Sequence, residues 1–325
     1  MTAGWTVRRL AATDDGLPGR GPGVDCHELD SGAPGPLVVV LGGVHGDEPE
    51  GTLAAGRLCR RELPLRAGRL RVVPVANEEA FRAASRTTPA DGVNLARVFP
   101  GDPAGSPTRR LAALLSARVL ADADLLIDLH TAGRHYDMPL FVGCLADDSA
   151  TGVASRAAAE AFGLETVWLH PTYSAGRSLS VPVARGRPAI YAEGPGGGSV
   201  DLETVGSYVR GVLGALTWLR MLAAGPAAPP ATGPVRYVAG GGDLDRDVLT
   251  FTTGGLFAAA VAAGDAVRTD QVLGTVHDVY GAVRQELRAP HDGRVMFLRR
   301  SAHVRPGDAA ASLAEELETV GAPGR

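Results

Sequence analysis

The sequence predicts an α/β protein in which a layered sheet is followed by a small all-β region. Short apolar runs alternate with helix-length segments up to residue 222, which is the pattern of a sheet covered by helices. Residues 223–234 contain only alanine, glycine, proline and threonine, a composition typical of a linker. Short strand-like runs separated by turns follow this segment. We therefore expect a first domain at 1–222, a linker at 223–234 and a small all-β domain at 235–325.

The clearest buried strand is the apolar run Leu37–Leu41, which Gly42 and Gly43 end in a tight turn. Pro49 and Glu50 then open a helix that continues through Ala55, because proline is favoured in the first helical turn. Further strands of this domain are expected at Thr6–Leu10, Val24–Leu29, Arg69–Val75, Ala123–Leu129, Pro139–Gly143, Glu165–Leu169 and Pro188–Ala192. Further helices are expected at Glu78–Ala84, Arg109–Ala121, Ala150–Phe162, Ser178–Arg185 and Leu202–Leu222.

The polar segment 85–107 shows little periodicity, and a loop of this length in a compact domain is usually functional or disordered. The last part of the chain is expected to form short strands between turns rich in glycine, proline and aspartate. These strands are expected at Val248–Phe251, Gly255–Phe257, Val272–Val276 and Gly293–Leu298.

The sequence contains no lysine, which excludes Schiff-base chemistry, a Walker-type phosphate loop and a lipoyl or biotin carrier. Its net charge of -4 gives no indication of nucleic-acid binding, and no stretch approaches the ~20 apolar residues of a membrane helix. Cys26, Cys59 and Cys144 lie far apart, as is typical of reduced thiols, and Met1–Leu10 lacks the pattern of a secretion signal. We therefore expect a cytoplasmic protein that binds neither nucleic acid nor membranes.

Three side chains at strand ends form a candidate metal site. His45 and Glu48 follow the strand at 37–41, and His130 follows the strand at 123–129. A single histidine at a strand end is more often an ordinary hydrogen-bonded residue. Two histidines and one carboxylate, however, are a ligand set suited to a catalytic zinc, with the fourth position left for water. The sequence therefore predicts one zinc ion per chain, held by His45, Glu48 and His130.

Four motifs occur in order along the chain. They are Gly43–Glu48 (GVHGDE), Asn94–Gly101 (NLARVFPG), Asp128–Thr131 (DLHT) and Ala192–Gly197 (AEGPGG). Together they resemble the succinylglutamate desuccinylase/aspartoacylase family, which is related to zinc carboxypeptidases. The resemblance covers most of the chain and implies a mixed-sheet, zinc-exopeptidase-like α/β/α catalytic domain at 1–222. It also implies that 235–325 is a barrel-sandwich module of the biotinyl/lipoyl type, with a structural or pocket-covering role because it lacks a carrier lysine.

Amide hydrolysis needs an activated water and a stabilised oxyanion. A zinc ion lowers the pKa of its bound water to about 7 and polarises the carbonyl as a Lewis acid. A carboxylate must still move the proton of the water to the leaving nitrogen, and Glu193, at a strand end before a glycine-rich stretch, is our candidate. The resemblance implies this same role, whereas the alternative is an acidic residue that only ends the strand. The resemblance also implies that Arg86 polarises the scissile carbonyl.

The resemblance assigns Arg97 to a substrate carboxylate, which a guanidinium can bind through two hydrogen bonds. In the family an asparagine stands directly before this arginine, but here the residue is Ala96, which cannot donate a companion hydrogen bond. The usual grip on an α-carboxylate is therefore altered, which leaves the substrate open. Asp128 either orients a ligating histidine or only ends its strand. The remaining candidates for substrate binding are Asn94, Tyr173, Arg177 and Tyr280.

We therefore expect a zinc-dependent amidohydrolase that acts on linear amide bonds and removes a short acyl group from an N-acyl amino acid or a related small amine. Two alternatives stay open. One is a zinc metallocarboxypeptidase that acts on a peptide-like substrate, and the other is a non-catalytic binding protein of the same fold. Assembly into a homo-oligomer is also left open.

Overall fold

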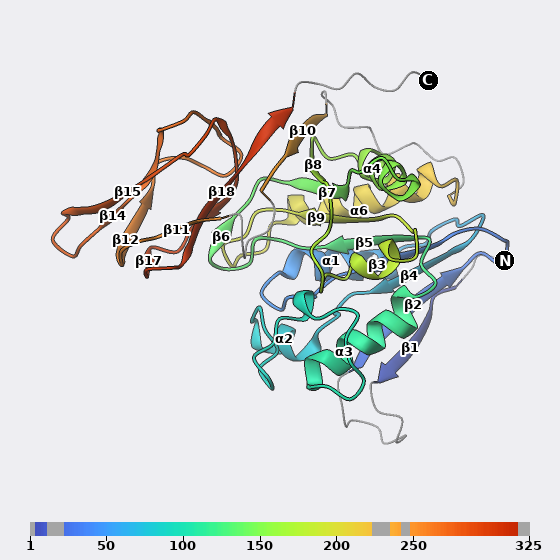
Figure 1. The fold of residues 1–325 in the computed structure, drawn as a ribbon. Coiled ribbons are helices and arrows are strands. Elements are labelled where there is room, and N and C mark those ends of the chain that lie inside the picture. Colours follow the sequence, from blue (N-terminus) through green and yellow to red (C-terminus); the bar gives the residue numbers. More distant parts are fainter. Residues whose placement is uncertain (1–3, 12–22, 223–234, 242–247, 318–325) are drawn as a thin grey trace.

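A computed structural model describes residues 4–11, 23–222, 235–241 and 248–317 (Figure 1). The predicted linker at 223–234 lies outside the described residues. The helices are α1 (Pro49–Cys59), α2 (Glu78–Ala83), α3 (Pro107–Leu115), α4 (Ala150–Phe162), α5 (Ser180–Val183) and α6 (Leu202–Trp218), with the short turns η1 (Leu95–Arg97) and η2 (Ser116–Leu120). None of the helices in the described part of the chain combines the length and the apolar character needed to cross a membrane.

The strands of the first part are β1 (Thr6–Ala11), β2 (Gly23–Asp30), β3 (Leu37–Leu41), β4 (Arg69–Val73), β5 (Leu125–Leu129), β6 (Tyr136–Asp137), β7 (Phe141–Leu145), β8 (Thr166–His170) and β9 (Ala189–Glu193). Those of the last part are β10 (Arg236–Ala239), β11 (Leu249–Thr250), β12 (Gly255–Ala259), β13 (Ala266–Val267), β14 (Val272–His277), β15 (Val283–Arg288), β16 (Gly293–Arg299), β17 (His303–Val304) and β18 (Ala309–Leu317).

The large sheet is mixed. Its centre, in the order β4-β3-β5-β9, is parallel, whereas β1, β2 and β7 run antiparallel to their inner neighbours. Because β3, β5 and β9 are parallel and adjacent, their carboxyl ends lie at the same edge of the sheet. The side chains that follow these three strands are therefore brought together.

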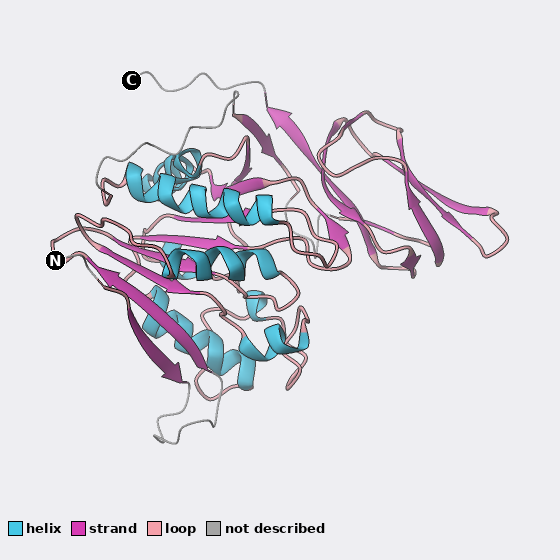
Figure 2. Ribbon diagram, turned by 180° about the vertical axis from the view of Figure 1, so that it is seen from behind, coloured by secondary structure: helices cyan, strands magenta, loops and turns pink. Residues whose placement is uncertain are grey.

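Alternate residues of β3 pack into two cores on opposite faces of this sheet. Val38 and Val40 join the core formed with α1, α4 and α6, whereas Val39 and Leu41 join the core formed with α3 and η2. Figure 2 shows α1 and α6 over one face of the sheet. A strand covered on both faces needs apolar residues at every position, which explains the unbroken run Leu37–Leu41.

The last part of the chain contributes to two sheets. Strand β10 pairs with β8, and β18 and β16 follow, so that the large sheet continues beyond residue 235. A separate antiparallel sheet has the order β15-β14-β12-β17. The prediction of a mixed α/β sheet with an all-β C-terminal region is confirmed, while the division at 1–222 and 235–325 stays a prediction.

Several predicted boundaries shift. Helix α6 ends at Trp218 and not at Leu222, because Arg220 adopts a left-handed conformation (φ 57°) that cannot continue an α-helix. The strand predicted from Pro139 begins at Phe141, and proline lacks the amide proton that a ladder requires. The helix predicted at 109–121 begins at Pro107 and changes to a π-helical turn at Ser116.

Candidate metal centre and substrate cavity

The loop between β3 and α1 carries His45 and Glu48, and its path depends on close backbone packing. Gly43 has a positive φ of 62°, which favours glycine. A Cβ atom at Gly46 would lie 1.9 Å from the carbonyl oxygen of Ala80, so a side chain there would push this loop away from α2. Pro49 then fixes the first turn of α1 directly after Glu48. These features hold the two side chains at the edge of the sheet.

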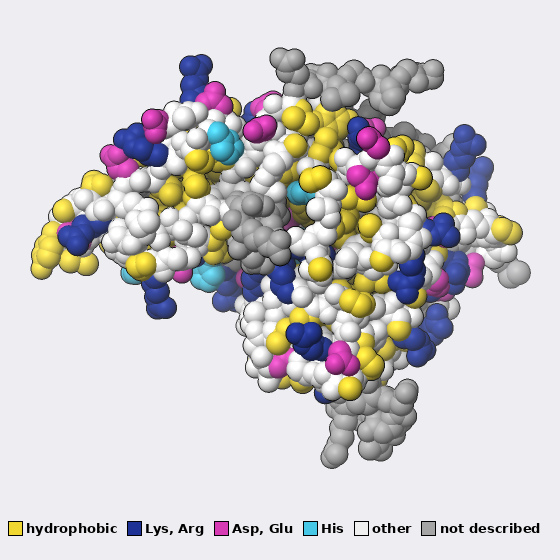
Figure 3. Space-filling view, viewed as in Figure 1, with side chains coloured by type: hydrophobic (Ala, Val, Ile, Leu, Met, Phe, Trp, Pro, Cys, Tyr) yellow, Lys and Arg dark blue, Asp and Glu magenta, His cyan; other side chains and the backbone are white. Residues whose placement is uncertain are grey.

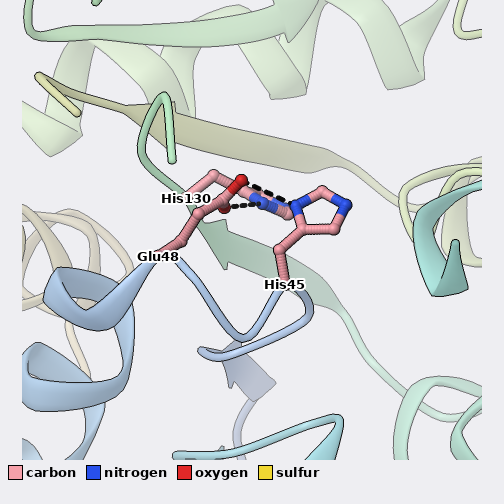
Figure 4. A group of neighbouring side chains, drawn as sticks. All are labelled: His45, Glu48 and His130. Atoms are coloured by element: carbon pink, nitrogen blue, oxygen red, sulfur yellow. Dashed lines mark hydrogen bonds and ion pairs between the residues drawn. The ribbon is translucent and has the colours of Figure 1, made fainter. Parts of the chain in front are cut away.

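The structure brings His45, Glu48 and His130 together (Figure 4). The Nδ1 atom of His45 lies 2.8 Å from Oε1 of Glu48, and the Nδ1 atom of His130 lies 2.8 Å from Oε2 of the same carboxylate. All three side chains are buried, and their ligand atoms lie within 4.8 Å of one another. Two imidazoles and one carboxylate that face a single point match the donor set of a catalytic zinc site.

Polar groups surround this cluster on its outer side. His130 Nε2 lies 3.2 Å from Oδ1 of Asp128, whose other oxygen accepts a hydrogen bond from Ser178. His45 Nε2 lies 3.0 Å from Oδ1 of Asn94. Such contacts fix the rotation of an imidazole ring and are a regular feature of protein metal sites.

The buried ionisable side chains at this site shift one another's pKa values. Burial lowers the pKa of His45, and the positive charge of Arg86 lowers it further. For His130, burial acts in the same direction, but the negative charges of Asp128 and Glu48 outweigh it and raise the pKa well above its usual value. Burial and the charge of Glu48 raise the pKa of Glu193 to about 8. Displaced pKa values of several neighbouring groups are common at functional sites.

A cavity of about 260 Å³ opens beside the cluster. It is lined by polar side chains that include Arg86, Glu193 and Arg177, and by aromatic rings that include Tyr173 and Tyr191. The Oε2 atom of Glu193 is shielded from solvent and has no hydrogen-bond partner among the described residues, so it is available to a molecule in the cavity. Arg86 donates a hydrogen bond of 2.9 Å to Oε1 of Glu48, which places its guanidinium at the border of cluster and cavity.

The predicted substrate-binding residues take different places. Tyr173 and Arg177 line the cavity, as does Ala96, the residue at the family asparagine position. Arg97 belongs to η1 next to Ala96, and its carbonyl faces the backbone of Gly176 near the cavity wall. Asn94 and Tyr280 are not among the lining residues.

Tyr280 lies at the turn between β14 and β15, where 94% of it is exposed. Figure 3 shows hydrophobic side chains at the tip of this hairpin and a mixture of acidic and arginine side chains over the rest of that face. The substrate-binding role predicted for Tyr280 stays a prediction, without a contact to the cavity in the described part of the chain.

Three further groups near the site were not predicted from the sequence. Glu50 is buried and accepts hydrogen bonds from Thr131 Oγ1 and the Asp201 backbone, both at 3.1 Å, and so links α1, the turn after His130 and the start of α6. Ser178 supports Asp128. His170 Nε2 lies 2.7 Å from the Tyr191 hydroxyl in the cavity wall, and burial lowers its pKa to about 4. The sequence offers only the position of Glu50 two residues after Glu48 as a signal.

Comparison with known proteins identifies the family of this chain. The model of the succinylglutamate desuccinylase/aspartoacylase catalytic domain matches residues 34–219, more than half of the chain. The chain belongs to this family. An N-alpha-acetyl-L-2,4-diaminobutyric acid deacetylase of Halomonas elongata is 34% identical over 295 residues, which cover 88% of this chain and 84% of the relative.

Two solved structures are similar over nearly their whole length. A succinylglutamate desuccinylase/aspartoacylase from Rhodobacter sphaeroides has a TM-score of 0.84 at 30% identity and covers 97% of both chains. The product-bound ectoine utilization protein EutE of Ruegeria pomeroyi has a TM-score of 0.86 at 27% identity and covers 96% of both chains. The C-terminal region is therefore part of the shared fold and not an addition peculiar to this chain.

Proposed function

We propose that this chain is a zinc-dependent amidohydrolase that removes a short acyl group from an N-acyl amino acid or a related small amine. The observation that carries the proposal is the convergence of His45, Glu48 and His130 on one point beside a cavity that Glu193 also lines. The family membership and the deacetylase relative from Halomonas elongata support a deacylase over a peptidase.

His45, Glu48 and His130 would hold one zinc ion, because their donor types and burial fit a three-ligand site. When bound, the ion supplies an activated water and a positive charge for the oxyanion. The Glu193 carboxylate takes the proton of the attacking water and then delivers it to the leaving nitrogen. The position of Glu193 in the cavity wall beside the candidate metal ligands favours this sequence.

Arginine side chains would orient the substrate. Arg86 borders the cluster and can donate to the carbonyl oxygen as negative charge develops on it. Arg177 lines the cavity, and Arg97 lies in the adjacent turn, so that either guanidinium can bind a substrate carboxylate. Ala96, in the cavity wall, cannot donate the hydrogen bond that the family asparagine would give to an α-carboxylate, which favours a substrate other than N-acetylaspartate or N-succinylglutamate.

The direct test is to measure amine release from a panel of N-acetyl, N-formyl and N-succinyl amino acids, with and without prior removal of metal by a chelator. N-acetylated diamino acids belong in the panel because of the relative from Halomonas elongata. We expect release from at least one N-acyl amino acid, its loss on chelation and its recovery with zinc. Release of C-terminal residues from peptides, with no release from the panel, would overturn the proposal in favour of a carboxypeptidase.

A further inference from the structure

Asn94 contacts a candidate metal ligand from outside the cavity. It stands directly before the turn η1, and its Oδ1 atom accepts a hydrogen bond of 2.9 Å from the backbone N–H of Ala96. The same oxygen lies 3.0 Å from Nε2 of His45. One side-chain atom therefore touches both the metal cluster and the turn that carries Ala96 and Arg97.

These contacts determine which way the ring of His45 faces. A backbone N–H can only donate, so the Asn94 atom that faces it is the oxygen, and that oxygen can only accept. His45 Nε2 is therefore the donor toward Asn94. Nδ1, on the other side of the ring, faces the cluster and lies 2.8 Å from Oε1 of Glu48. With zinc held by both side chains, Nδ1 would present its lone pair to the ion while Asn94 held Nε2–H on the outer side.

We propose that Asn94 is a positioning residue that holds the ring of His45 with Nδ1 directed at the metal. In this role Asn94 acts through His45 and does not itself contact the substrate. The inference rests on the proposed function, because it takes His45 as a metal ligand. Asp128 stands in the corresponding place beside Nε2 of His130, at 3.2 Å. Each histidine thus has a side-chain oxygen beside its outer nitrogen, and removal of such a partner typically lowers metal affinity about 10- to 100-fold.

Asn94 also caps η1, so a substitution could act through the turn and not through His45. Three variants separate these effects. Asn94→Asp keeps an acceptor for both Ala96 and His45. Asn94→Ser keeps a cap, because a serine oxygen accepts from the backbone two residues on, but its shorter side chain does not reach the imidazole. Asn94→Ala removes both contacts.

The test is zinc affinity of the full-length protein, measured by competition with a chromogenic chelator, together with thermal unfolding of the metal-free protein. We expect Asn94→Ser to bind zinc about 10- to 100-fold more weakly than the wild type at an unchanged unfolding temperature. Asn94→Asp should keep a zinc affinity within a few-fold of the wild type, because its carboxylate can accept from His45 Nε2 as the amide oxygen does. Asn94→Ala should lose both zinc affinity and thermal stability.

An Asn94→Ser variant with the zinc affinity of the wild type would overturn the inference. If only Asn94→Ala lost zinc affinity, the effect would belong to the cap of η1 and not to the contact with His45. The outcome is separable from that of the proposed function. A wild-type chain that binds zinc tightly, responds to Asn94→Ser and yet hydrolyses no N-acyl substrate would refute the deacylase and leave the role of Asn94 standing. A wild-type chain that binds no zinc would refute both.

Discussion

The two sheets of this protein use polar residues in opposite ways. Strands β3 and β5 at the centre of the large sheet are buried throughout, and polar side chains collect beyond their carboxyl ends. Strands β12 and β15 of the smaller sheet each expose most of their residues. None of the polar side chains in β12, β14, β15 and β17 is buried. Buried polar groups need partners, and the large sheet supplies them where parallel strands end together.

The comparison implies that changes beyond the carboxyl ends of β3 and β5 act on chemistry, whereas changes in the C-terminal region act on stability. The C-terminal region nevertheless touches the segment that follows His130. Strand β6, which follows His130, pairs with β16, and the backbone of Arg300 donates a hydrogen bond to the carbonyl of His135. The predictions below test how far this separation holds.

The largest effect is expected from His45→Ala. Loss of one of three protein ligands should reduce zinc content from near one per chain to near zero and abolish hydrolysis. Metal analysis of the purified protein measures the zinc content per chain. The matched control is His277→Ala in β14, whose imidazole nitrogens lie within hydrogen-bond distance of Thr275 and Gly281, and which should retain zinc. Unchanged zinc content in His45→Ala would refute the ligand set.

Glu193→Gln should keep zinc and lose about 10²- to 10⁴-fold in kcat, because the amide has the shape of the carboxylate but cannot accept a proton. Steady-state kinetics beside metal analysis checks this expectation. Glu286→Gln, at an exposed position of β15, is the control and should leave both quantities unchanged. A variant at position 193 with full activity would remove Glu193 from the mechanism.

Arg299→Ala tests the contact between the two regions. Arg299 donates a hydrogen bond of 3.0 Å to the Tyr136 hydroxyl, and its guanidinium carbon lies 5.1 Å from the centre of that ring. We expect the free energy of unfolding to fall by about 1–3 kcal/mol, with kcat little changed. Chemical denaturation and kinetics measure the two effects. A fall in kcat as large as that of Glu193→Gln would show that the C-terminal region contributes to catalysis and not only to stability.

Asp91→Ala probes the segment 85–107. Partial burial disfavours the charge of Asp91, but hydrogen bonds from Ser106 and Thr108 outweigh it and lower the pKa of this carboxyl. A carboxyl with a lowered folded-state pKa stabilises the protein above its unfolded pKa of about 3.9, and this contribution is lost as the pH falls through the folded value. The variant should lose about 1–2 kcal/mol at pH 7, as for a removed helix cap. The difference in free energy of unfolding between wild type and variant should be smaller at pH 3 than at pH 7, which unfolding curves at the two pH values measure. An equal difference at both pH values would contradict a stabilising role of the charged Asp91 carboxylate.

Tyr280→Ala should have the smallest effect. The side chain stands at an exposed turn, so the free energy of unfolding should change by less than about 0.5 kcal/mol and KM should be unchanged. A clear rise in KM would support the substrate-binding role predicted for Tyr280 from the frequency of aromatic side chains at pockets, and would show that this hairpin reaches a cavity in solution. Kinetics at several protein concentrations would then distinguish a contact within one chain from a contact between two.

The sequence was sufficient to predict the central sheet and the convergence of His45, Glu48 and His130. An unbroken apolar run such as Leu37–Leu41 has few interpretations besides a strand buried on both faces, and a residue that follows such a strand lies at the sheet edge whatever the rest of the chain does. The convergence of His45 with His130 follows from the parallel pairing of β3 with β5.

The supports of the cluster could not be predicted in the same way. The contact of Asn94 with His45 depends on how segment 85–107 folds back over 49 residues, and no periodicity in that segment fixes its path. Glu50 was visible only as a residue that opens a helix, while its partners Thr131 and Asp201 come from distant elements. The pairing of β10 with β8, which carries the large sheet into the C-terminal region, is equally a long-range event.

Gly241 lines the cavity although it lies far along the chain from His45, and Trp168 in the same wall donates a hydrogen bond to the carbonyl of Gly240. A nascent polypeptide that has emerged from the ribosome only as far as residue 222 therefore still lacks part of this wall. The three residues of the candidate metal site all precede residue 131, whereas the cavity beside them is complete only once residue 241 has been added.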